Sequence, residues 1–217
     1  MQAYVSLWSA DLLDVGRDID RVADIADGFH IDVFDGHNVA ELLFGPDFVA
    51  AVRKRTALPL DVHLNVSDPG LWARRFIDVG ADMVTVQASA CPDIAATLGL
   101  IRQAGARPSL GVEVHEEVAD ALRWTGHIDR FLLMGTAIGV KGAGQVPDAP
   151  DRVRRLKTGI STLGSGQPVF VDGGIRAETV GPIADAGADG VIPGSLVYGA
   201  PDPAAAIRAL HVLGGPK

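Results

Sequence analysis

Short apolar runs alternate with amphipathic stretches along the whole chain, eight times each. Regular alternation of strands with helices is typical of parallel sheets built from strand–helix–strand units. The predicted strands are Tyr4–Trp8, Phe29–Phe34, Leu60–Asn65, Met83–Gln87, Ser109–Val114, Arg130–Gly135, Val169–Asp172 and Gly190–Pro193. The predicted helices are Arg17–Ala26, Asp47–Thr56, Pro69–Val79, Pro92–Ala104, Glu116–Thr125, Asp151–Thr162, Ala177–Ala186 and Pro203–Leu213.

Three joints between a predicted helix and the next strand resemble one another. Residues 78–82, 103–107 and 185–189 read Asp-Val-Gly-Ala-Asp, Gln-Ala-Gly-Ala-Arg and Asp-Ala-Gly-Ala-Asp. In each, we expect the glycine to end the helix in the left-handed conformation, after which the strand begins at once. Eight units of roughly 27 residues fit a compact (β/α)8 barrel. A doubly wound open sheet is the rival arrangement, but eight units without an extra domain favour a single barrel domain over residues 1–217.

Charge and cysteine content exclude several function classes. The formal net charge is −8, so the chain lacks the basic surface that holds nucleic acid or an anionic membrane. Cys91 is the only cysteine, which excludes an internal disulfide and a thiolate zinc cluster. No stretch has the composition of a membrane span or an export signal. We therefore predict a cytoplasmic protein that binds neither nucleic acid nor a membrane.

Polar residues alternate with apolar ones in the second predicted strand. His30, Asp32 and Phe34 are two residues apart, so their side chains point to one face of the strand. Ile31 and Val33 suit the opposite face, against the helices. We therefore expect His30 and Asp32 to point into the barrel, where the carboxyl ends of the strands form the usual active-site mouth.

Two further strands add polar side chains to the same mouth. In the third predicted strand the alternation directs Asp61, His63 and Asn65 inward, and the seventh ends in Asp172. Two imidazoles and two carboxylates make a credible site for one divalent ion, and such donors suit Zn²⁺, Mn²⁺, Fe²⁺ or Co²⁺. The alternative interpretation is that both histidines belong to the core and bond to neighbouring aspartates.

Glycine-rich loops follow the last three predicted strands, at residues 139–144, 173–174 and 193–195. Glycines expose backbone amides, and the loops after the last two strands of a barrel frequently hold a phosphate group. Each loop alone could be a simple turn, but three at one rim favour a phosphate site. Lys141 lies in the first loop, where it could pair with an anion or remain solvated.

Several motifs resemble the ribulose-phosphate 3-epimerase family. They are Ser9-Ala-Asp11, Phe29-His-Ile-Asp-Val-Phe-Asp-Gly-His37, Asp61-Val-His-Leu64 and Val171-Asp-Gly-Gly-Ile175, in matching order across nearly the whole chain. The resemblance implies a ribulose-phosphate-binding barrel with one divalent ion, often zinc. It implies that the metal ligands are His30, Asp32, His63 and Asp172.

The resemblance also implies an activity. Asp32 and Asp172 would act as acid and base on opposite faces of C3 of a phosphorylated ketose, interconverting D-ribulose 5-phosphate and D-xylulose 5-phosphate through a cis-enediolate. Ser6 and His63 would contact the substrate, and the protein would form homo-oligomers. The phosphate would be bound by Gly142, Gly144, Gly173, Gly174, Gly194 and Ser195.

The chain departs from the family pattern around the substrate. Phe34 and Asn65 stand where methionines are usual, Gln87 replaces a histidine, and the loop Ala137–Gln145 is longer and carries Lys141. These differences indicate the same reaction on an altered substrate, with Phe34, Asn65 and Lys141 as further substrate contacts. Two alternatives remain at this stage: an aldolase or decarboxylase that uses the same metal site, and a barrel that binds metal or phosphate without turnover.

Overall fold

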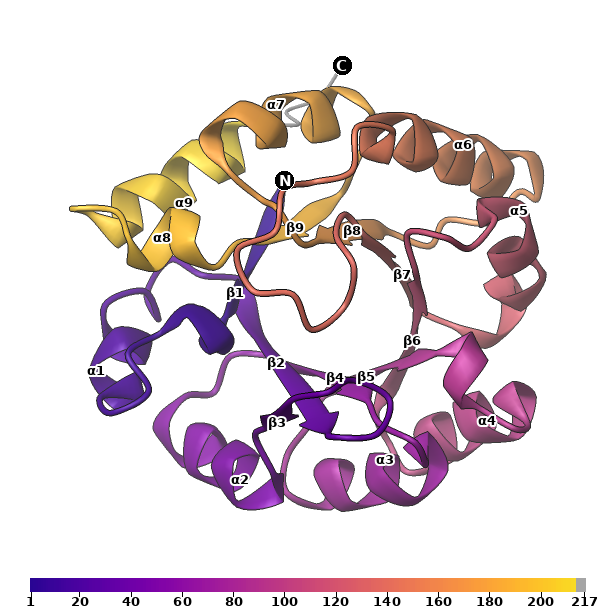
Figure 1. Cartoon of the computed structure of the whole chain (residues 1–217), viewed down its shortest axis with the longest axis horizontal. Coiled ribbons are helices and arrows are strands. Elements are labelled where there is room, and N and C mark those ends of the chain that lie inside the picture. Colours follow the sequence, from indigo (N-terminus) through magenta and orange to yellow (C-terminus); the bar gives the residue numbers. More distant parts are fainter. Residues whose placement is uncertain (214–217) are drawn as a thin grey trace.

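The computed structural model describes residues 1–213, and these form a closed barrel of parallel strands surrounded by helices (Figure 1). The predicted (β/α)8 barrel is therefore confirmed. Closure follows from the pairing of β1 with β9 on one side and with β2 on the other. The strands are β1 Gln2–Ser6, β2 Gly28–Asp35, β3 Leu42–Leu43, β4 Leu60–Asn65, β5 Met83–Gln87, β6 Arg107–Val112, β7 Arg130–Met134, β8 Val169–Asp172 and β9 Gly190–Ile192.

Helices follow the strands and pack on the outside of the barrel (Figure 1). Asp68, Asp93 and Asp202 cap three of them, because each side chain accepts a hydrogen bond from a backbone N–H in the first turn. The helices are α1 Val15–Asp20, α2 Pro46–Arg55, α3 Pro69–Asp78, α4 Ile94–Gln103, α5 Val118–Ala121, α6 Ala149–Thr162, α7 Ala177–Asp185, α8 Ser195–Tyr198 and α9 Pro203–Val212.

The similar joints adopt the predicted backbone conformation. Gly80, Gly105 and Gly187 have φ of 111°, 95° and 98°, a region that favours glycine because it has no Cβ. Each glycine therefore ends a helix and turns the chain straight into the next strand, which keeps the units short.

Several element boundaries differ from the prediction. The first strand ends at Ser6 rather than Trp8, and residues Leu7–Ser9 form a 3₁₀ turn instead. Ser6 N makes the last ladder bond, to Pro193 O at 3.0 Å, after which the chain turns. The short strand β3 pairs antiparallel with the end of β2 and was not predicted, nor was the four-residue α8.

Apolar side chains pack mainly between the strands and the helices. Ile31 and Val33 belong to this layer, as the alternation predicted. The barrel interior contains a smaller apolar cluster, made by Tyr4, Leu132, Met134, Phe170 and Ile192. Beside this cluster the interior is polar, because the inward side chains of β2, β4 and β5 are mostly His, Asp, Thr and Gln. This polar half positions the candidate site.

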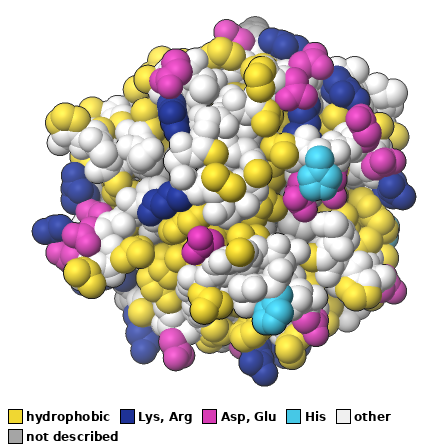
Figure 2. Space-filling model, in the orientation of Figure 1, with side chains coloured by type: hydrophobic (Ala, Val, Ile, Leu, Met, Phe, Trp, Pro, Cys, Tyr) yellow, Lys and Arg dark blue, Asp and Glu magenta, His cyan; other side chains and the backbone are white. Residues whose placement is uncertain are grey.

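Basic side chains do not gather on the face that Figure 2 shows. Lys and Arg are dispersed among Asp and Glu around the rim of the barrel. Within residues 1–213, no helix has the length and apolar character required to cross a membrane.

Candidate active site with a metal centre

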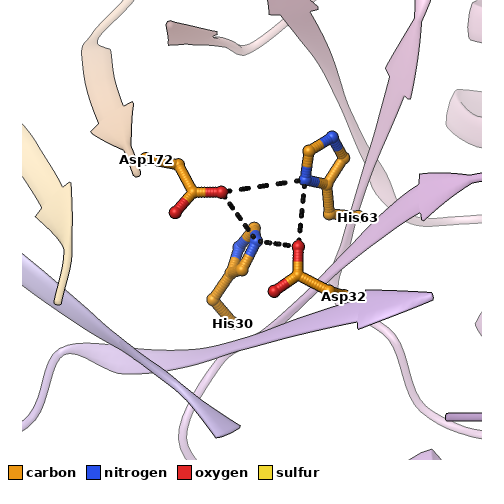
Figure 3. Close-up of side chains that lie close together, drawn as sticks. All are labelled: His30, Asp32, His63 and Asp172. Atoms are coloured by element: carbon orange, nitrogen blue, oxygen red, sulfur yellow. Dashed lines mark hydrogen bonds and ion pairs between the residues drawn. The ribbon is translucent and has the colours of Figure 1, made fainter. Parts of the chain in front are cut away.

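Four side chains converge inside the mouth of the barrel: His30, Asp32, His63 and Asp172 (Figure 3). One ligand atom from each lies within 4.8 Å of all the others. His30 Nε2 is 3.3 Å from Asp32 Oδ1 and 3.7 Å from Asp172 Oδ2. His63 Nδ1 is 3.4 Å and 4.0 Å from the same two oxygens. The sequence analysis singled out these four residues, and the structure brings them together.

Strand register explains why they meet. β2 and β4 are neighbours, and Asp32 is aligned with His63. Because alternate residues share a face, His30 points inward from one level further down β2. Asp172 ends β8, which is separated from β2 by β1 and β9. The site is therefore complete only when the sheet closes into a barrel.

The donor set fits a divalent ion. Ligand atoms that lie about 2.0–2.2 Å from one tetrahedral ion are about 3.3–3.6 Å apart, close to the observed separations. His63 Nδ1 is fully buried and has no hydrogen-bond partner, although it faces both carboxylates. An unpartnered buried nitrogen is costly unless a ligand satisfies it. Two imidazole nitrogens and two carboxylate oxygens suit Zn²⁺ and other first-row ions.

Hydrogen bonds behind His30 leave its Nε2 facing the other ligands. His30 Nδ1 donates to Asp61 Oδ2 at 2.7 Å, and Thr85 Oγ1 donates to Asp61 Oδ1 at 3.0 Å. Arg130 donates to the same carboxylate. Metal-bound histidines usually donate their second N–H to such a carboxylate. Both ring nitrogens of His30 lie within hydrogen-bond distance of an aspartate, as the alternative interpretation expects, since Nε2 is 3.3 Å from Asp32 Oδ1. What favours a metal site is that Nε2 also lies among ligand atoms of His63 and Asp172.

The amide of Gln87 lies behind His63. Gln87 Nε2 is 2.7 Å from His63 Nε2, and Gln87 Oε1 is buried without a partner. Rotating the amide by 180° places the oxygen at the imidazole, where it accepts a hydrogen bond from Nε2–H. His63 Nδ1 then keeps its lone pair towards the carboxylates. Gln87 therefore supplies a neutral partner for this imidazole.

The two carboxylates in the site have different pKa values. Burial opposes ionisation of Asp32, but the charge and hydrogen bonds of His30 and His63 outweigh it and lower the pKa. Burial and the neighbouring charge of Asp32 raise the pKa of Asp172 to about 6. The pKa of His30 is raised well above its ordinary value, because Asp32 and Asp61 outweigh the effect of burial. Separated pKa values in one pair suit different acid–base roles.

Metal binding is expected to depend strongly on pH. An ion must displace the proton that the raised pKa of His30 retains and, below pH 6, the proton of Asp172. Because ligands bind in their deprotonated forms, affinity rises with pH. We expect the affinity to rise more steeply below pH 6, where the proton of Asp172 must be displaced as well as that of His30, than above it. Competition with a chromophoric chelator measures this slope, and a pH-independent affinity would contradict the site.

A cavity opens above the four side chains, between the loops at the carboxyl ends of the strands. Asp32 and Asp172 reach its wall, whereas His30, His63 and Asn65 are fully buried and do not line it. The other sequence-predicted residues that line the cavity are Ser6, Phe34, Lys141, Gly142, Gly173, Gly174, Gly194 and Ser195. Gly144 does not line it, whereas residues 139–143 do; the contact of Gly144 with a phosphate stays a prediction.

Asn65 and Lys141 lie differently from what their positions in the sequence suggested. Asn65 is completely buried, and its Nδ2 faces His63 O at 3.5 Å rather than the cavity. Lys141 Nζ donates to Trp8 O at 2.7 Å and lies 5.5 Å from the centre of the Trp8 ring. The lysine therefore connects the loop after β7 to the turn after β1.

The residues of the cavity wall that sequence reasoning missed include Ser9 and Arg176. Arg176 donates to Gly142 O at 2.6 Å and to Ala143 O at 3.2 Å, so it holds the loop after β7 from the other side. Its position directly after the Asp-Gly-Gly-Ile motif was the available signal. Ser9 belongs to the Ser-Ala-Asp motif that the sequence analysis quoted without a role.

Fold and ligand set together define a (β/α)8 barrel with a candidate divalent-metal centre at the carboxyl ends of its strands. The model of the ribulose-phosphate 3-epimerase family matches residues 2–198. The chain belongs to this family.

Individual relatives agree with the family match. The ribulose-phosphate 3-epimerase of Bacillus subtilis (strain 168) is 35% identical over 208 residues, which is 95% of this chain and 96% of the relative. The enzyme of the same name from Mycobacterium leprae (strain TN) is 34% identical over 200 residues, 91% of this chain and 89% of the relative. Among solved structures, 3-hexulose-6-phosphate synthase from Salmonella typhimurium has a TM-score of 0.72 at 23% identity, covering 99% and 98% of the two chains. That likeness concerns the fold alone.

Proposed function

We propose that the protein is a divalent-metal-dependent 3-epimerase of a ketose phosphate, with D-ribulose 5-phosphate and D-xylulose 5-phosphate as its substrate pair. The observation that carries this proposal is the pair Asp32 and Asp172, which both join the metal-ligand cluster and both reach the cavity wall. Membership of the epimerase family and the names of the relatives support the choice of reaction.

His30, Asp32, His63 and Asp172 would hold the ion, and zinc is the first ion to test because nitrogen and carboxylate donors at these separations suit it. When bound, the ion supplies Lewis-acid stabilisation of the negative charge that develops on the substrate oxygens. This assistance matters because a proton next to a ketone is too weakly acidic to leave at neutral pH without it.

Asp32 and Asp172 would move the proton at C3. One carboxylate removes it from one face of the carbon, and the other returns a proton to the opposite face, which inverts the configuration. The lowered pKa of Asp32 and the raised pKa of Asp172 show that the two carboxylates stand in different environments. Different environments allow two carboxylates to take different acid–base roles.

The phosphate seat is proposed at the glycine loops after β7, β8 and β9, which line the same cavity as Phe34. Gly173 and Gly174 have φ of 96° and 66°, and a Cβ on either would collide with Thr136 or Gln145. Because neither position has room for a side chain, backbone atoms form this part of the cavity wall. Gly142, Gly194 and Ser195 line the same cavity, and the guanidinium of Arg176 adds positive charge beside it.

Lys141→Met is expected to raise KM for the phosphorylated substrate about three- to tenfold, because one charge-assisted hydrogen bond that holds the loop after β7 is lost. The value of kcat should change less than twofold. Steady-state kinetics measures both constants. Lys54→Met is the matched control, since Lys54 is exposed in the last turn of α2. An unchanged KM in Lys141→Met would show that the Trp8 contact does not shape the site.

Proton NMR in D₂O on ribulose 5-phosphate tests the proposed function. We expect the C3 proton signal to disappear and xylulose 5-phosphate to appear, only with metal-loaded protein. A folded, metal-loaded sample that exchanges no C3 proton would refute this substrate pair. A change in substrate mass would instead support an aldolase or decarboxylase, the alternative that Asn65 and Lys141 suggest from the sequence. The homo-oligomeric state and the cytoplasmic location stay predictions. Light scattering would measure the oligomeric state.

A further inference from the structure

One arginine lies inside the barrel. Arg130 begins β7, and 2% of its surface is exposed. Its guanidinium carbon is 4.9 Å from the centre of the Phe170 ring and 5.8 Å from that of Tyr4. A charge buried this deeply is costly unless other groups compensate it. The groups that contact Arg130 therefore show which negative charge its guanidinium is paired with.

Those contacts end on the carboxylate that holds His30. Arg130 Nη2 donates to Asp61 Oδ2 and, at 3.0 Å, to Thr85 Oγ1. Arg130 Nε donates to Ser109 Oγ at 3.3 Å. Thr85 in turn donates to Asp61 Oδ1 at 3.0 Å. Both oxygens of Asp61 are thus fixed, and Oδ2 lies 2.7 Å from His30 Nδ1.

With a divalent ion bound and both histidines neutral, the formal charges at the centre of the barrel would balance only with this arginine. Asp32, Asp61 and Asp172 lie in one connected group with His30. One divalent ion and one guanidinium would together match three carboxylates. Among residues 1–213, Arg130 is the only Lys or Arg that pairs with any of the three. Lys141 and Arg176 bond to backbone carbonyls at the rim instead.

We propose that Arg130 is a positioning residue for the metal centre. By holding the Asp61 carboxylate in place, it keeps the Nδ1–H of His30 engaged and directs His30 Nε2 towards the other three ligand atoms. The contact joins residues 69 positions apart in the chain and reaches the site only through Asp61. This inference rests on the metal site of the proposed function, but it assigns a role to a residue that contacts neither metal nor substrate.

Zinc affinity of Arg130→Met tests the role. We expect the dissociation constant to rise about tenfold, at the low end of the effects seen when partners of metal ligands are removed, as measured by competition with a chromophoric chelator. In an Asp61→Asn background, adding Arg130→Met should cause no further loss, because the two residues act as one unit. If the losses of zinc affinity caused by Arg130→Met and Asp61→Asn were fully additive, Arg130 would not act through Asp61, and the proposal would be overturned.

A second readout separates positioning from general stability. In protein labelled with ¹⁵N-histidine, the Nδ1–H proton of His30 should be protected from solvent exchange in the wild type and exchange faster in Arg130→Met. Arg152→Met is the matched control, because Arg152 is also buried but donates to the backbone carbonyls of Met134, Glu113 and Glu116. We expect this control to lose stability without a change in zinc affinity or in the His30 proton.

Arg130→Lys keeps the positive charge but lacks the planar guanidinium with its several N–H donors. It is the variant to measure if Arg130→Met does not fold. We expect it to bind zinc with an affinity between those of the wild type and the methionine variant. Folded variants that bind zinc as tightly as the wild type, with an unchanged His30 proton, would overturn the role of Arg130 and leave the metal site standing. A wild-type protein that binds no divalent ion would refute the metal site and the positioning role together.

Discussion

Replacing either Asp32 or Asp172 with asparagine is expected to lower the rate of C3 epimerisation by at least about 10³-fold, because each change removes a proton-transfer group that contributes about 10²–10⁴-fold and also a proposed metal ligand. The two variants should nevertheless differ. If the carboxylates serve opposite faces of C3, each variant retains slow solvent exchange with one epimer and loses it with the other. Proton NMR in D₂O, started separately from ribulose 5-phosphate and xylulose 5-phosphate, measures this difference.

Asp68→Asn is the matched control for these variants. It makes the same change of charge at the N-cap of α3, where asparagine accepts the Leu71 N–H as well as aspartate does. Its epimerisation rate should equal that of the wild type. Persistent, wild-type exchange of both epimers by Asp32→Asn would show that Asp32 is not an acid–base group, whatever its position in the cluster.

Removing the metal is expected to abolish turnover. Without an ion, nothing stabilises the negative charge that forms when the C3 proton leaves, so we expect the rate to fall by at least about 10³-fold, or several kcal/mol in the barrier. Dialysis against a chelator, followed by the NMR assay, measures the loss. Adding back Zn²⁺, Mn²⁺, Fe²⁺ or Co²⁺ one at a time should restore the rate and identify the ion that serves best.

Circular dichroism provides the control for metal removal. The barrel is closed by strand pairing and by the apolar layer between strands and helices, none of which involves the ion. The far-UV spectrum should therefore be unchanged after dialysis. Full activity in protein that elemental analysis shows to be free of metal would contradict the proposed role of the four-residue cluster His30, Asp32, His63 and Asp172.

Much of the candidate metal site could be predicted because its residues follow local rules. His30, Asp32 and His63 alternate with Ile31 and Val62 in strands, and alternation alone decides which side chains share a face. The apolar residues at the other parity had to face the helices, which left the histidines and carboxylates inside. Asp172 was found in the same way, as the last residue of a strand before a glycine pair.

Loop geometry was harder to predict. Gly144 resembles the neighbouring glycines in sequence but lies off the cavity wall, and Trp8 extends from a 3₁₀ turn rather than from the first strand. The contact of Lys141 with Trp8 O joins residues 133 positions apart. Side-chain periodicity says nothing about such a contact, because the course of a loop depends on what it packs against.

The sequence by itself determined the repeating strand–helix units, the glycine joints that end the helices, and the inward face of each strand. These follow from backbone sterics and side-chain alternation over a few residues. Only the tertiary structure decided that Arg130 reaches Asp61 and that Gln87 lies behind His63. These contacts depend on the register and closure of the whole barrel, since each joins strands whose separation in space no local pattern specifies.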